Sequence, residues 1–138
     1  MTKVFIDTNI FLDLLLNREN FAEDAEKLLL WCEEGLINGS TSAINIANIY
    51  YLVNQQKSKS ETKKVIKQIL DIVAIPNTSR KDLLLAIDSS FSDFEDAIQF
   101  FTALNIDGIN YIVTRNKKDY KYATIPVVTA AEFLQLFK

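Results

Sequence analysis

Apolar runs bounded by polar clusters alternate along the chain with patterns typical of helices. Lys3-Val4-Phe5-Ile6 is a short run without polar alternation, which predicts a strand buried on both faces. An apolar helical pattern follows at once, and the same succession recurs. Further strands are predicted at 38–41, 72–75, 109–113 and 125–128. This βα alternation predicts a parallel sheet with helices on both faces.

Hydroxyl side chains mark the starts of several predicted helices. Ser42, Ser79 and Thr129 each stand directly before such a helix, in the capping position. The helix after Ser42 is apolar nearly all round, so we expect it to be buried, with Asn45 and Asn48 as its polar exceptions. In the helix after Ser79, the expected core positions are Leu83, Leu84 and Ile87.

Length and composition favour one globular domain. The chain has 138 residues, 49% of them hydrophobic and 24% charged, and we expect a single domain over 1–138. No apolar run approaches the ~20 residues that span a bilayer, and no signal peptide is recognisable. The one cysteine, Cys32, lies at helical spacing with leucines and is interpreted as core packing. A cytoplasmic protein without a membrane partner is expected.

The chain contains no histidine, which excludes Ser-His and Cys-His catalysis and His-ligated metals. Its chemistry must rest on carboxylates, hydroxyls, amides and cations, which favours hard metals such as Mg²⁺ or Mn²⁺. The formal net charge of −3 argues against a strongly basic nucleic-acid surface, although a local basic patch is compatible with it.

Polar groups follow several predicted strands. Asp7 follows the first, Ser40 to Ser42 the second, and Thr114 to Asn116 the strand at 109–113, while Asp93 and Asp96 share a helix face. Carboxylates gathered in one crevice repel each other, and a divalent cation relieves that repulsion. The alternative is that these acids are scattered caps and turn residues, and spacing alone does not decide between the two.

Four segments resemble PIN-domain proteins, the fold of VapC-type toxin ribonucleases. They are Val4-Phe5-Ile6-Asp7-Thr8-Asn9, Thr41-Ser42 with the helix through Tyr51, Asp93-Phe94-Glu95-Asp96-Ala97, and Val113-Thr114-Arg115-Asn116 with Asp119-Tyr120. The resemblance implies a three-layer α/β/α fold with a mainly parallel sheet of about four or five strands. It also implies an endoribonuclease that uses Mg²⁺ or Mn²⁺ to hydrolyse RNA phosphodiester bonds, commonly as a homodimer with an antitoxin partner.

The resemblance also assigns roles to residues of this chain. Asp7 and Asp96 match the family's first and helix-borne acids, and both are expected to be catalytic metal ligands. The supporting polar residues are Thr8, Asn9, Asn48, Thr114 and Asp119.

Two departures from the family pattern are Asn48 and Asn116, which stand where acids are often found. An amide oxygen can touch a cation but carries no charge. Asn116 is kept among the expected catalytic residues, and Asp93 is expected to compensate as a further catalytic acid and metal ligand. On this view, Asn48→Glu would tighten metal binding.

Cations near the last motif are candidates for RNA contact. Arg115, Lys117 and Lys118 would form a basic rim beside the acids, where an RNA backbone could lie. Tyr120 or Tyr122 could stack a base, although packing on the sheet edge is the simpler interpretation. The lysines between 57 and 67 are interpreted as a solvated helix face, with RNA contact as the alternative.

Two other functions compete with the nuclease. A PIN-fold module with weak or lost catalysis could bind nucleic acid or a protein partner, and Asn48 and Asn116 keep that possibility open. A phosphoacceptor receiver domain would need an aspartate pair after the first strand, but Asp7 stands alone there.

Overall fold

A parallel sheet of four strands lies at the centre of the computed structural model, which describes residues 1–137. The strands are β1 (Lys3–Ile6), β2 (Asn38–Ser40), β3 (Tyr111–Val113) and β4 (Val127–Val128), and their order in the sheet is β2-β1-β3-β4. All neighbouring pairs are parallel. The prediction of a mainly parallel sheet of four or five strands is confirmed.

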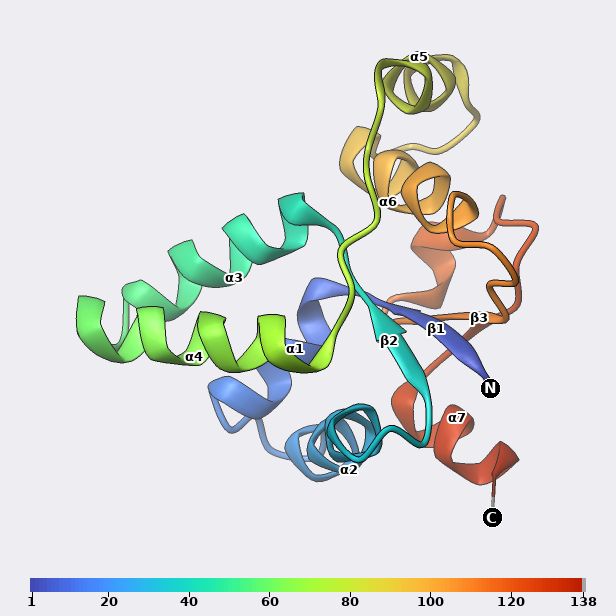
Figure 1. Ribbon diagram of the computed structural model, residues 1–138. Coiled ribbons are helices and arrows are strands. Elements are labelled where there is room, and N and C mark those ends of the chain that lie inside the picture. Colours follow the sequence, from blue (N-terminus) through green and yellow to red (C-terminus); the bar gives the residue numbers. More distant parts are fainter. Residues whose placement is uncertain (138) are drawn as a thin grey trace.

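Helices cover both faces of this sheet (Figure 1). They are α1 (Thr8–Leu15), α2 (Ala22–Glu33), α3 (Ala43–Asn54), α4 (Lys59–Ile72), α5 (Arg80–Asp88), α6 (Phe94–Leu104) and α7 (Ala130–Leu136), with a short 3₁₀ helix η1 (Lys117–Tyr120). One face packs against α1, α2 and α7, whereas α6 and η1 cover the other. Within residues 1–137, no helix is both long and apolar enough to cross a membrane.

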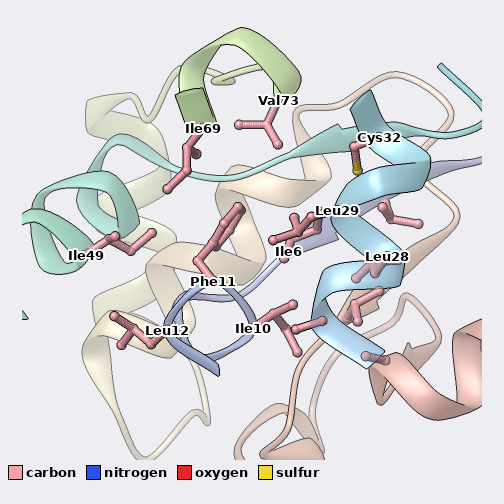
Figure 2. Packing of buried hydrophobic residues seen from close by; sticks show 14 of the residues in the cluster. Ile6, Ile10, Phe11, Leu12, Leu28, Leu29, Cys32, Ile49, Ile69 and Val73 are labelled. Atoms are coloured by element: carbon pink, nitrogen blue, oxygen red, sulfur yellow. The ribbon is translucent and has the colours of Figure 1, made fainter. Parts of the chain in front are cut away.

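The larger core lies between the sheet and the first helices (Figure 2). Ile6 of β1 packs there with Phe11 of α1 and Leu28 of α2, all of them buried. Cys32 is buried in the same cluster, as the sequence predicted. A side chain at Gly39 would begin 2.6 Å from the Cys32 sulfur, so only glycine lets β2 pass so close to α2.

The predicted helix caps are confirmed. The side chains of Ser42, Ser79 and Thr129 each accept a hydrogen bond from a backbone N–H in the first turn of α3, α5 and α7. Each cap supplies an acceptor to an N–H group that has no partner within the helix, which fixes where the helix begins.

The strand predicted at 72–75 is wrong. Helix α4 continues to Ile72, and the following segment makes only a single bridge, between Ala74 and Ser40 of β2. A short apolar run does not distinguish the end of an amphipathic helix from a strand, and here the helical periodicity of the preceding residues prevails.

The expected burial of α3 and α5 is also wrong. In α3 only Asn45, Ile49 and Val53 are buried, and Tyr51 is 72% exposed. In α5 the three expected core residues are exposed: Leu83, Leu84 and Ile87. Helix α5 packs against α6 rather than on the sheet, so one side of it remains uncovered within the chain. An apolar helix face indicates that its burial against another surface is favourable, but it does not indicate that the same chain supplies that surface.

Candidate functional site

Asp7 stands at the carboxyl end of β1 and caps α1. Its Oδ1 accepts the Thr8 N–H at 2.8 Å, and its Oδ2 accepts the Thr114 hydroxyl at 2.9 Å. This second contact follows from the register, in which Ile6 pairs with Val113, so that the next residues of both strands emerge side by side. Both carboxylate oxygens are therefore held by neutral donors.

The loop after β3 is tied to α1 through Asn9. The Asn9 amide donates to the Thr114 hydroxyl at 3.4 Å, and its oxygen accepts the Arg115 N–H at 3.2 Å. The Asn116 N–H also donates to the Thr114 hydroxyl, at 3.1 Å. Thr114 is fully buried and joins Asp7 to this loop. Asn9 and Thr114 thus lie next to Asp7, and their supporting role at a metal site stays a prediction.

A second chain of hydrogen bonds links Thr8 to the end of β2. The Thr8 hydroxyl donates to the Asn45 oxygen at 2.6 Å, the Asn45 amide donates to the Thr41 hydroxyl at 2.9 Å, and Thr41 donates to the Ile6 carbonyl at 2.7 Å. The carboxyl ends of β1 and β2 and the start of α3 thus form one rigid unit. Asn45 serves this structural network.

Asp96 and Asp93 lie at the start of α6. Asp93 is the cap of this helix, and its carboxylate accepts the Asp96 N–H at 3.0 Å. Burial raises the pKa of Asp96 to about 7, with further contributions from the negative charges of Asp93, Asp7 and Asp119. Burial also raises the pKa of Asp7, although its hydrogen bonds to Thr114 and Thr8 oppose that effect.

One surface cleft of about 440 Å³ joins the two segments. Asp7 and Asp96 both line it although they are far apart in the sequence, as the metal-site hypothesis requires. The other lining residues are Thr8, Asn9, Leu12, Asn48, Tyr51, Leu52, Glu95 and Asn116. Asp93, Thr114 and Asp119 are not among them. Asp93 caps α6, and Asp93 and Asp119 both lie near enough to Asp96 for their charges to raise its pKa.

The donor set fits a divalent cation held by few protein ligands. Within residues 1–137, no ion pair reaches Asp7 or Asp96, and no three acidic side chains already surround a single point. Two unpaired carboxylates with an amide oxygen, that of Asn116, are the kind of set with which Mg²⁺ completes its shell from water and phosphate.

Two of the predicted RNA-binding cations are paired within the chain. Arg115 lies 3.3 Å from Asp13 and its guanidinium stacks 4.2 Å from the Phe21 ring centre, while Lys117 lies 3.0 Å from Glu132. Lys118 is exposed. Of the two tyrosines considered for base stacking, Tyr120 is only 2% exposed and packs in the core.

Glu95 is the charged lining residue to which the sequence analysis gave no role. It precedes Asp96 in the first turn of α6, where acids commonly serve the helix dipole, so the sequence offered no reason to single it out. Its carboxylate accepts a hydrogen bond from the Asn48 amide at 2.6 Å, across the cleft between α3 and α6.

Comparisons with known proteins agree with this architecture. The fold is similar to that of the VapBC2 complex from Rickettsia felis bound to a promoter DNA fragment, with a TM-score of 0.65 and 18% identity over 92% of this chain and 97% of that chain. It is also similar to VapBC-1 from nontypeable Haemophilus influenzae, with a TM-score of 0.67 and 15% identity over 94% and 99% of the two chains.

A toxin–antitoxin complex from Klebsiella pneumoniae shares 25% identity, with a TM-score of 0.66 over 92% of this chain and 97% of that chain. No curated protein sequence matches the chain. The family model described as PIN domain matches residues 3–118, which include Asp7, Asp96 and the segments that hold them. The chain therefore belongs to the PIN domain family.

Proposed function

We propose that this protein is an endoribonuclease that uses Mg²⁺ or Mn²⁺ to hydrolyse RNA phosphodiester bonds. The observation that carries the proposal is the placement of Asp7 and Asp96 in one cleft, where no cation among residues 1–137 forms an ion pair with either. Acids that serve only stability are normally paired or fully solvated, whereas burial, together with the charges of Asp93 and Asp7, raises the pKa of Asp96.

Asp7, Asp96 and the amide oxygen of Asn116 would hold the cation. When bound, it supplies positive charge to the phosphate and lowers the pKa of water. Thr8 and Thr114 keep the Asp7 carboxylate in a fixed orientation through their hydrogen bonds. A proton on Asp96 must leave before that side chain can bind a cation, and its pKa of about 7 makes this possible near neutral pH.

The cleft wall offers contacts for RNA beyond the acids. Tyr51 lines the cleft and is largely exposed, so its ring can stack an unpaired base. Lys118 follows the Asn116 segment and is free to approach a phosphate, unlike the paired Arg115 and Lys117. These features favour a single-stranded RNA substrate, whose bases are accessible for stacking.

Protein partners form part of the proposal. The similar solved structures include toxin–antitoxin complexes, so an antitoxin is a reasonable partner for this chain. The exposed apolar residues of α5, Leu83, Leu84 and Ile87, would be covered in a homodimer.

The second candidate is a PIN-fold module whose catalysis is weak or lost. Asn48 and Asn116 favour it, because neither amide supplies negative charge to the cleft. Such a module would bind RNA without cleaving it.

A cleavage assay on single-stranded and structured RNA with Mg²⁺ or Mn²⁺ tests the proposal. We expect cleavage that EDTA abolishes and that Asp7→Asn or Asp96→Asn lowers by about 100-fold or more, since each removes charge that holds the cation. The matched control is Asp71→Asn, an exposed acid at the end of α4 outside the cleft. Full activity in Asp7→Asn would refute the assignment, and RNA binding without cleavage in wild type would favour the second candidate.

A further inference from the structure

The contact between Asn48 and Glu95 joins two helices at the rim of the cleft. A carboxylate only accepts hydrogen bonds, so the Asn48 amide must be the donor in the 2.6 Å contact with Glu95 Oε1. Both residues line the same cleft as Asp7 and Asp96. A hydrogen bond that orients a carboxylate toward a site is a common way in which proteins hold a metal ligand.

The three cleft carboxylates differ in how many of their oxygens are occupied. Both oxygens of Asp7 accept hydrogen bonds, from Thr8 and Thr114. Glu95 accepts only the Asn48 bond, and within residues 1–137 its Oε2 has no hydrogen-bond donor and no ion pair. Glu95 therefore keeps one uncommitted carboxylate oxygen in the cleft that Asp7 and Asp96 also line.

A buried hydroxyl lies close to the acids of the cleft. Tyr120 is 2% exposed, and within residues 1–137 its hydroxyl makes no hydrogen bond of good geometry. Burial raises the pKa of Tyr120, and the charges of Asp7 and Asp96 raise it further, so the hydroxyl faces Asp7 as a neutral donor. It lowers the pKa of Asp7, so Asp7 is surrounded by neutral donors, whereas Glu95 keeps an oxygen without a donor.

We infer that Glu95 is the third carboxylate that holds the divalent cation and that Asn48 positions it. The inference rests on the proposed function. It explains why an amide at position 48 of α3 is compatible with a metal site, because Glu95 of α6 supplies the acid that α3 lacks. Glu95 is exposed and its long side chain can turn toward Asp7 and Asp96 once a cation offsets their repulsion.

The assignment reverses the effect expected for a glutamate at position 48. In the wild-type chain, Asn48→Glu would place two carboxylates in contact, since Asn48 and Glu95 lie 2.6 Å apart. A glutamate there should strengthen the site only when Glu95 has been neutralised. A purely structural link between α3 and α6 predicts no such dependence of metal binding on the pair.

Titration calorimetry with Mn²⁺ on the intact protein, without RNA, tests this inference. We expect Glu95→Gln to weaken Mn²⁺ binding about 10-fold or more. Asn48→Glu should not bind more tightly than wild type, and Asn48→Glu with Glu95→Gln should recover affinity to within about 3-fold of wild type, because the charge has moved to the facing helix. Glu34→Gln, an exposed acid after α2, is the matched control and should bind as wild type.

Melting temperatures without metal establish that each variant is folded before binding is compared. Wild-type affinity in Glu95→Gln, with binding lost in Asp7→Asn, overturns the role of Glu95 and leaves the proposed function standing. Unchanged affinity in both variants refutes the metal site itself. A double variant as weak as Glu95→Gln overturns the pairing of positions 48 and 95.

Discussion

Asp7 and Asp13 lie at the two ends of α1 and have opposite surroundings. Asp13 is 1% exposed and lies 3.4 Å from Arg18 and 3.3 Å from Arg115. The Arg115 guanidinium also stacks over the Phe21 ring. Asp7 is partly buried and meets only neutral donors. Burial raises the pKa of both acids. In Asp13 the charges of Arg115 and Arg18 oppose that rise, whereas within residues 1–137 no cation opposes it in Asp7. A buried acid with its own cations secures the fold, whereas one without them is available to a ligand.

The largest expected effect is a difference in unfolding free energy between a variant that removes a cation beside Asp13 and a variant of Asp7 itself. Arg115→Met should lower the free energy of unfolding by about 1–3 kcal/mol at pH 7, because it leaves the buried Asp13 with Arg18 alone, whose side chain is 36% exposed. Asp7→Asn should leave the metal-free protein equally stable or more stable, since it removes repulsion and retains the shape of the side chain. Urea unfolding in EDTA measures both.

Rescue provides the control for that comparison. Adding Asp13→Asn to Arg115→Met should recover part of the lost stability, because the unpaired charge is removed as well. If Asp7→Asn destabilises the protein as much as Arg115→Met does, the distinction between the two acids is lost.

The pH dependence of Mn²⁺ binding should follow Asp96. Its pKa is raised to about 7 by burial and by neighbouring acids, so the folded protein holds a proton there that the unfolded chain releases at lower pH. Mn²⁺ affinity should therefore fall by about tenfold per pH unit below 7, as the proton competes with the cation.

The same proton affects stability without metal. Its stabilising contribution is fully present below the ordinary aspartate pKa and is lost as pH rises through about 7. In Asp96→Asn, the decline in stability over this range should be smaller. Identical pH profiles for wild type and Asp96→Asn would contradict the assignment of this pKa.

The smallest expected effect distinguishes the two lysines of η1. Lys118→Ala should lower the affinity for single-stranded RNA in EDTA about twofold and reduce the salt dependence of binding, because an unpaired cation contributes to phosphate contact. Lys117→Ala should change affinity less, since Lys117 is paired with Glu132. Fluorescence anisotropy at several salt concentrations makes the comparison, and equal effects of both variants would contradict it.

Local sequence patterns were sufficient to predict most helices and strands, but not to predict which of their faces are buried. The strands around Phe5 and Ile112 and the caps Ser42, Ser79 and Thr129 depend on nearby residues, and these predictions were confirmed. The burial of α5 depends on what lies opposite it, which the pattern of its own residues does not contain.

The same distinction holds in the site. Asp7 and Asp96 were predicted from their positions after a strand and in a helix, and they do share a cleft. The partners of Arg115 and Glu95 were missed because Asp13 and Asn48 are distant in sequence. The charge of Arg115 alone did not indicate that its guanidinium forms an ion pair with the buried Asp13.

The hydrogen bond from Thr114 to Asp7 spans 107 positions of the chain, and the parallel pairing of β1 with β3 is equally long in range. Contacts of this kind close large loops and form late in folding. During synthesis Asp7 leaves the ribosome long before Thr114 does, so the nascent chain has no assembled cleft until the segment around Thr114 has emerged. If the protein cuts RNA, its own messenger and the ribosome that makes it are exposed to that activity only after β3 has been synthesised.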